Sequence, residues 1–214
     1  MFCFSVFCFS CLCLYIHICI HALLSTEDGI RVLDLGCGTG NYTNALAERF
    51  PNSTFIGLDY STQALSSAND TKKQKGIMNV KFVEGDAHAL PKEWIGTFDM
   101  VFMNNVLHDL PDPFTCLDEI YKVMKTDGCF CLLEVGCHSD PLKNVCDATA
   151  AMNYSLSIFI CLASSLVDPP HVGYGAMWGK EEIEKALTNH RFTFSKDISD
   201  SMLGPTVAFY CTKG

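Results

Sequence analysis

The sequence lacks features that would point to several common classes of protein. It has no long basic run, and its 24 acidic residues outnumber 15 basic ones, giving a net charge of −9. Such a balance argues against non-specific nucleic-acid binding, in which Lys and Arg neutralise phosphates. Internal repeats and a low-complexity linker are also missing. The 214 residues, 49% apolar and 18% charged, therefore predict a globular fold with a full core.

Metal-binding patterns are missing from most of the chain, although it has 13 cysteines. Beyond residue 20 the remaining cysteines form no C-x-x-C pair and no Cys/His ligand spacing. We therefore expect no resident metal. Free buried thiols that pack as small hydrophobes suit a reducing compartment, so we expect the catalytic part of the chain in the cytoplasm.

Charge is missing altogether from residues 1–24, and the first charged residue is Glu27. The length suits a membrane-spanning helix. A signal peptide would need a basic start, which is not there. The third alternative is an extension of a truncated chain. We treat residues 1–26 as a separate apolar segment, with membrane association through residues 1–24 as one alternative, and residues 27–214 as one domain.

From residue 30 onward, strand-like and helix-like runs alternate. The predicted strands are 31–35, 54–59, 80–84, 98–103 and 129–134. The predicted helices are 41–50, 62–75, 87–90 and 113–125, the last stopped by Gly128. This alternation predicts a parallel sheet with helices on both faces.

The alternation of strand-like and helix-like runs ends after residue 140. Residues 142–166 predict one or two helices that end at Asp168-Pro169-Pro170, and residues 181–189 predict another. Two strands, 191–198 and 206–212, joined by a loop at 200–205, predict an antiparallel pair at the sheet edge. The expected fold class is α/β: a Rossmann-like, doubly wound, mostly parallel seven-stranded sheet with an antiparallel C-terminal strand pair.

The stretch Leu33–Gly40 reads L-D-L-G-C-G-T-G and joins the first predicted strand to the first predicted helix. Such a turn presents backbone N–H groups and a helix N-terminus to a polar or anionic ligand. The dinucleotide fingerprint is G-x-G-x-x-G. Gly36 and Gly38 fit it, but Asn41 takes the third glycine's place and Gly40 comes one residue early. A side chain at these glycines would block the ligand or demand a forbidden φ.

Polar residues follow the other predicted strands. Asp59 ends the second strand, 19 residues after Gly40, while Asp86 follows the third and Asn104 the fourth. Ligands of open α/β sheets bind beyond these strand ends. The two oxygens of Asp59 can accept from adjacent ribose hydroxyls. Asp86 can accept from an exocyclic amine such as that of adenine, or cap a helix that begins at Ala87.

One further acid, Asp34, lies two residues before Gly36 and suits a ligand ammonium, while the N–H groups of the turn suit a carboxylate. A methionyl group carries both, and a dinucleotide does not. In order and spacing, the motifs resemble those of the class I S-adenosylmethionine-dependent methyltransferases. The matching stretches are Leu33–Gly40, Asp59, Gly85–Ala87, Phe98–Val101 and Leu117–Gly128.

The resemblance covers residues 30 to about 135 well and implies S-adenosylmethionine as the cofactor. The implied cofactor-binding residues are Asp34, Gly36, Cys37, Gly38, Gly40, Asp59, Tyr60, Asp86, Ala87 and Asn104. The stretch Gly173–Gly179 is similar to a subgroup whose members usually carry an N-terminal winged-helix domain. From this sequence we expect no such domain, which bears on dimerisation and pocket closure.

Methyl transfer needs a general base only where the acceptor must lose a proton. His108, just past the fourth strand, is the candidate base; alternatively it packs over the cofactor or caps its loop. Glu134, at the end of the fifth strand, faces the acceptor or bonds to backbone.

The sequence thus predicts methyl transfer to an unidentified acceptor, which we expect to be a small molecule. Two alternatives remain open. One is another nucleotide-binding α/β enzyme such as a dehydrogenase. The other is a truncated protein that binds cofactor or acts only through interaction. The sequence specifies no oligomeric state.

Overall fold

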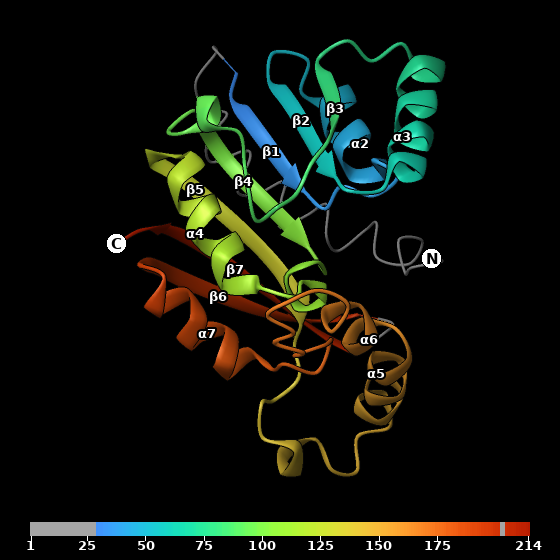
Figure 1. Ribbon diagram of the computed structural model, residues 1–214, viewed down its shortest axis with the longest axis vertical. Helices are drawn as coiled ribbons and strands as arrows, with labels where there is room; N and C mark the ends of the chain where they lie inside the picture. Colours follow the sequence, from blue (N-terminus) through green and yellow to red (C-terminus); the bar gives the residue numbers. More distant parts are fainter. Residues whose placement is uncertain (1–28, 202–203) are drawn as a thin grey trace. The chain divides into compact units, whose positions relative to one another are not determined.

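The computed structural model describes residues 29–201 and 204–214 (Figure 1). Seven strands form one sheet in the order β3-β2-β1-β4-β5-β7-β6. The strands are β1 (Arg31–Leu35), β2 (Thr54–Asp59), β3 (Val80–Glu84), β4 (Phe98–Asn104), β5 (Met124–Val135), β6 (Phe192–Ser201) and β7 (Gly204–Lys213). β1 pairs in parallel with β2 and β4, β2 pairs in parallel with β3, and β6 with β7 is antiparallel. The predicted fold class is confirmed.

The helices alternate with the strands as far as β5 and then follow one another. They are α2 (Asn41–Arg49), α3 (Thr62–Lys75), α4 (Pro113–Val123), α5 (Ala148–Phe159), α6 (Cys161–Ser165) and α7 (Lys180–Asn189). Three short 3-10 helices are η1 (Lys92–Trp94), η2 (Leu107–Asp109) and η3 (Pro141–Asn144). The described residues separate into two compact units. One holds the residues up to Met103 together with Glu119–Cys131, and the other holds Asn104–Asp118 and Leu132–Gly214.

The first unit is built on β1, whose apolar side chains Val32, Leu33 and Leu35 are fully buried. Burial on both faces is typical of a parallel strand covered by helices. Helices α2 and α3 pack against β2 and β3, as Figure 1 shows. Ser61 caps α3 by accepting a hydrogen bond from the Ala64 N–H, and Gly76 ends the helix in the left-handed conformation.

The second unit contains the antiparallel pair β6–β7 and the C-terminal helices. Asp147 caps α5 by accepting hydrogen bonds from the N–H groups of Thr149 and Ala150. Helix α7 packs against β6, and α6 packs against η2.

Several predicted boundaries are corrected. The helix expected at 87–90 is wrong: those residues form a turn, and a 3-10 helix follows at η1. Gly128 does not stop a helix but lies inside β5, because α4 already ends at Val123. The loop expected at 200–205 is shorter, because β6 runs to Ser201 and β7 starts at Gly204. Long β-pairing overrides the local turn signal there.

The predicted apolar segment, residues 1–26, lies outside the described residues, and the extent of the single domain stays a prediction. Within the described part, no helix is long and apolar enough to span a membrane. The eight described cysteines are free thiols, and six of them are buried. Their packing agrees with the expectation of small hydrophobic thiols.

Candidate functional site

The glycine turn after β1 is bonded to the end of β2. The N–H groups of Gly36 and Cys37 both donate to the Leu58 carbonyl, at 2.8 and 3.0 Å. Register places Leu35 beside Leu58, so the two strands end side by side. φ is positive at Gly36, Gly38 and Gly40, at 74°, 53° and 67°. Only glycine adopts this conformation without strain, which confirms the predicted need for glycine here.

Asp59 fastens this turn to the end of β2. Its Oδ2 accepts a hydrogen bond from the Gly38 N–H at 2.8 Å, and its Oδ1 accepts one from the Ser61 N–H at 2.8 Å. The residue is 8% exposed. A carboxylate oxygen has about two acceptor positions. Each oxygen of Asp59 therefore keeps capacity for one more donor, such as a ligand hydroxyl.

The glycines of the turn have different surroundings. A Cβ added to Gly38 would have no atom within 4 Å, so the Gly38 backbone faces open space. A Cβ on Gly40 would lie 2.6 Å from the Phe82 ring and 2.7 Å from Ala68. Gly40 thus allows α2 to pack closely on its neighbours, and its predicted role in cofactor binding stays a prediction.

Asp34 lies buried beneath the turn. It is 4% exposed, and its Oδ2 accepts a hydrogen bond of 2.5 Å from Thr43 Oγ1 of α2. Burial, only partly offset by the Thr43 hydroxyl, raises the pKa of Asp34 to about 7. Asp59 adds to this effect as a nearby like charge. The carboxyl is therefore poised between its neutral and charged forms near neutral pH.

Asp86 lies just beyond β3 and is exposed. Its Oδ1 accepts from the His88 N–H at 2.9 Å and lies 2.6 Å from His88 Nδ1. A modest burial effect opposes ionisation, but these two His88 groups prevail and lower the pKa of Asp86. The Nε2 atom of His88 is buried and has no hydrogen-bond partner among the described residues. An acceptor and an unpaired ring nitrogen thus lie together at this strand end.

The other predicted cofactor residues end their strands as expected. Tyr60 follows β2 and is 69% exposed. Ala87 follows Asp86 in the turn after β3. Asn104 is the last residue of β4, and its Oδ1 accepts from Asn105 Nδ2 at 3.1 Å. Their cofactor roles stay predictions. Asp99, from another matching motif, is structural: it accepts from the Arg31 N–H and pairs with Lys125.

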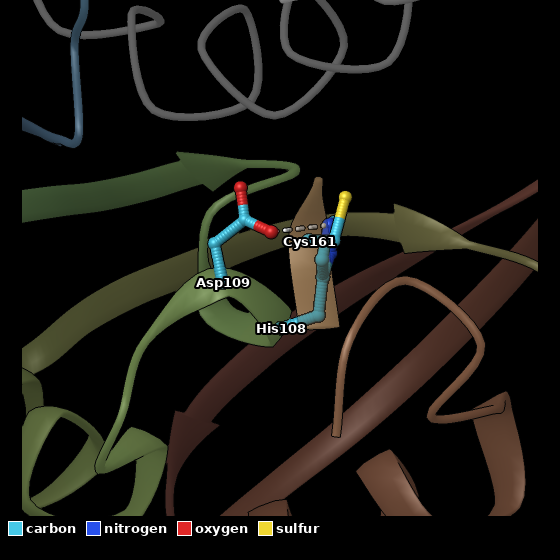
Figure 2. Close-up of side chains that lie close together, drawn as sticks. All are labelled: His108, Asp109 and Cys161. Atoms are coloured by element: carbon cyan, nitrogen blue, oxygen red, sulfur yellow. Dashed lines mark ion pairs between the residues drawn. The ribbon is translucent and has the colours of Figure 1, made fainter. Parts of the chain in front are cut away.

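His108 and Glu134 form a buried ion pair in the second unit. His108 Nδ1 bonds to Glu134 Oε2, and the two side chains are 4% and 1% exposed. On its other side, His108 Nε2 lies 3.2 Å from Asp109 Oδ1. Figure 2 shows Asp109 and His108 beside Cys161, the first residue of α6. The structure therefore brings the two predicted catalytic candidates together.

The electrostatics of this cluster favour a charged imidazole. Burial by itself lowers the pKa of His108, but the Glu134 carboxylate, with help from Cys161 and Asp109, raises it well above its ordinary value. Burial raises the pKa of Asp109, and the nearby His108 offsets part of that effect. A histidine held this way is a stronger base than free imidazole once it has lost its proton.

Sequence reasoning missed Thr43, His88, Asp109 and Cys161. Thr43 is a helix residue with no motif signal, and its hydroxyl reaches Asp34 only through the close packing of α2. His88 follows Asp86 by two residues, a spacing typical of an Asx-type turn. The hydrogen bond from the His88 N–H to Asp86 could therefore have been predicted from the sequence. Asp109 adjoins His108 in the sequence, but Cys161 is brought there only by the packing of α6 on η2.

Comparison with known proteins finds a matching family model and similar curated proteins. The family described as "Methyltransferase domain" has a model that matches residues 26–191. Among curated proteins, a demethylmenaquinone methyltransferase from Lactococcus lactis is 42% identical over 101 residues, which are 47% of this chain and 40% of the relative. The chain spans about half the length of the curated relatives that it matches.

Solved structures share the fold. A SAM-dependent methyltransferase from Aquifex aeolicus aligns with a TM-score of 0.61 and 18% identity, over 90% of this chain and 88% of its own. A family 2 O-methyltransferase from Planctomyces limnophilus, in complex with apigenin, aligns with a TM-score of 0.65 and 20% identity. That match covers 88% of this chain and 52% of the other.

Proposed function

Because this chain belongs to the methyltransferase domain family, we propose that it transfers a methyl group from S-adenosylmethionine to a hydroxyl of a small molecule. Membership confirms the family that the sequence motifs resemble. The place and the hydrogen bonds of Asp59 are the observation that carries the proposal. This residue ends β2, bonds to the Gly38 N–H of the glycine turn, and has acceptor positions left for the two hydroxyls of a ribose.

The residues of the first unit fit this cofactor. The open space at Gly38 lets a ligand approach the backbone, which a Cβ would prevent. Exposed Asp86 offers a hydrogen-bond acceptor to an exocyclic amine on an adenine edge. Asp34 offers a carboxyl to the methionyl ammonium. The N–H groups of Gly36, Cys37, Gly38 and Gly40 already donate to Leu58, Asp59 and Cys37, so we do not propose the expected contact of these groups with the cofactor carboxylate. Tyr60 and Ala87 complete the set in this unit by their places after β2 and β3. Asn104, which belongs to the second unit, stays a candidate from its place at the end of β4.

The cofactor, when bound, supplies a methyl group on a sulfonium, which already has a good leaving group. The protein must then align the acceptor and exclude water. For a hydroxyl acceptor it must also remove a proton. We propose that His108 Nε2 accepts this proton. Glu134 holds the opposite ring nitrogen, Nδ1, and so positions the ring. The raised pKa of His108 supports this role, because phenolic hydroxyls also lose their protons well above neutral pH.

A phenolic acceptor agrees with the apigenin complex of the related fold, although that likeness is one of fold. The curated relatives are named for demethylmenaquinone and trans-aconitate, which agree with a small-molecule acceptor without favouring a hydroxyl. We propose a small hydroxylated ring compound as the acceptor. The eight free thiols among the described residues support a reducing, cytoplasmic setting for the catalytic part.

Calorimetric titration of the full chain with S-adenosylhomocysteine and, separately, with NAD tests the proposal. We expect micromolar binding of S-adenosylhomocysteine and no binding of NAD. Binding of NAD alone would assign the site to a dehydrogenase. Binding of neither compound would favour a protein that acts only through interaction.

The acceptor assignment is tested by incubating the full chain with S-adenosylmethionine and a panel of phenols and carboxylic acids. Formation of S-adenosylhomocysteine is the readout. We expect turnover with at least one phenol, and a kcat that rises with pH as His108 loses its proton, at a pH above the ordinary pKa of imidazole. Turnover with carboxylic acids alone would overturn the hydroxyl assignment.

A further inference from the structure

We propose that His108, Asp109 and Cys161 form a binding site for a zinc-type divalent cation in the second unit. One ligand atom from each residue lies within 4.8 Å of those from the other two (Figure 2). The three residues come from two elements, η2 and α6, which pack on each other. The sequence predicts no resident metal, because 52 positions separate Cys161 from Asp109 and no short ligand motif results.

The spacing of these atoms suits a tetrahedral ion. Zinc lies about 2.0–2.3 Å from nitrogen, oxygen and sulfur ligands, so its ligand atoms are roughly 3.3–3.6 Å apart. His108 Nε2 and Asp109 Oδ1 are already 3.2 Å apart. Even the widest pair has to close by little more than about 1 Å to reach that range, a shift within reach of side-chain rotation.

Asp109 Oδ1 is the oxygen that would face the ion. It is buried and meets no hydrogen-bond geometry among the described residues, and its charged neighbour is His108 Nε2, at 3.2 Å. A buried carboxylate oxygen is costly unless a cation faces it, and a bound divalent cation would take over that role when His108 gives up its Nε2 proton. Asp109 as a whole stays partly accessible, with 29% of its side chain exposed, so an ion can approach along it.

Glu134 supplies the support that a metal-bound histidine needs. Its carboxylate bonds to Nδ1 of His108, which fixes the ring and leaves Nε2 directed at Asp109. Histidine ligands commonly donate their second N–H to a carboxylate in this manner. The arrangement therefore has three ligands with a carboxylate behind the histidine, and a fourth coordination position remains for water or another small ligand.

The ligand types favour zinc over calcium or magnesium. A thiolate and an imidazole are ligands of zinc and related transition metals, whereas calcium and magnesium take oxygen ligands. On binding, the Cys161 thiol and the His108 Nε2–H each release a proton to solvent. The thiolate and the Asp109 carboxylate then balance the two positive charges of the ion.

If the proposed function also holds, the cation and the acceptor's proton compete for the same atom, His108 Nε2. Bound zinc would then hold the enzyme inactive. That consequence rests on the proposed function, but the binding site does not.

Titration of the full chain with Co²⁺ tests the site, because a cobalt–thiolate bond absorbs in the near ultraviolet. We expect the Cys161→Ser variant to lose one equivalent of this absorption. The matched variant Cys129→Ser, which alters another buried free cysteine in β5, should keep it. Zn²⁺ should displace the cobalt and raise the midpoint of thermal unfolding of the unaltered chain.

Equal cobalt absorption in Cys161→Ser and the unaltered chain would overturn the site, since other cysteines would then be the ligands. Absence of micromolar cobalt binding would overturn it as well. Circular dichroism shows whether Cys161→Ser folds, and Asp109→Asn, which keeps the thiol, gives a second variant with expected weaker binding. The titration needs neither cofactor nor acceptor, so its failure and that of methyl transfer are distinguishable.

Discussion

The carboxylate of Asp59 accepts a hydrogen bond from the Gly38 N–H at 2.8 Å, and this bond joins the end of β2 to the glycine turn that follows β1. Asp59 therefore has two tasks in the proposed enzyme. It shapes the turn, and it keeps acceptor positions for the cofactor ribose. The two tasks are separable by measuring affinity and stability in the same variants.

Asp59→Ala should weaken S-adenosylhomocysteine binding by about 1.5–3 kcal/mol, the value of a hydrogen bond to a charged group. That is roughly a 10- to 150-fold rise in Kd by calorimetry. Asp70→Ala, which removes an exposed acid from α3, is the control and should bind normally. An unchanged Kd for Asp59→Ala would place the ribose elsewhere.

Gly38→Ala and Gly40→Ala should have different consequences, although both force a side chain into positive φ at a cost of about 1–2 kcal/mol. Gly40→Ala should lose more stability in urea unfolding, because its Cβ would press on Phe82 and Ala68. Gly38→Ala should chiefly lose cofactor affinity, because its Cβ would project into open space. The reverse order of stabilities would contradict this assignment.

The stability of the cofactor-free protein should fall as pH rises from about 4 through 7, in part because of Asp34. Its pKa is raised from 3.8 to about 7 in the folded protein. The contribution of neutral Asp34 to the free energy of unfolding is therefore fully present below the pKa of the unfolded chain, and it is lost as pH rises through the pKa of the folded protein. Each unit of pKa difference corresponds to about 1.4 kcal/mol. Urea unfolding of Asp34→Asn, which stays neutral, should show a smaller decline over this window.

Cofactor binding should release a proton near neutral pH. An ammonium beside Asp34 favours its charged form, so affinity should rise as pH rises through about 7. Calorimetry of S-adenosylhomocysteine binding in two buffers of different ionisation enthalpy measures the released protons. Asp34→Asn should abolish the difference between the buffers. Proton uptake instead of release would show that the ammonium binds away from Asp34.

His108→Gln should destabilise the second unit by about 3–5 kcal/mol, because it leaves the Glu134 charge buried without its partner. The double variant His108→Gln with Glu134→Gln removes both charges and should recover much of that loss in urea unfolding. Additive losses in the double variant would mean that the two side chains do not form a charged pair.

The order of elements was predictable because each left a local signature. The predicted bounds of β1, β2, β3 and α3 match the structure. Their apolar runs, the Ser61 cap and the Gly76 stop act over a few residues, which is the range that a sequence pattern covers. The ends of β6 and β7 were not predictable, because each strand is extended by pairing with the other.

The sequence by itself determined the family, the glycine turn and the acids that follow β2 and β3, since each depends on residues close together in the chain. The tertiary structure decided what lies around those residues. Asp34 is buried against Thr43, Gly40 packs on Phe82, and Cys161 lies beside Asp109. Burial and long-range packing set these surroundings, and with them the pKa of Asp34 and the proposed metal site, because charge and coordination depend on neighbours that a local pattern does not contain.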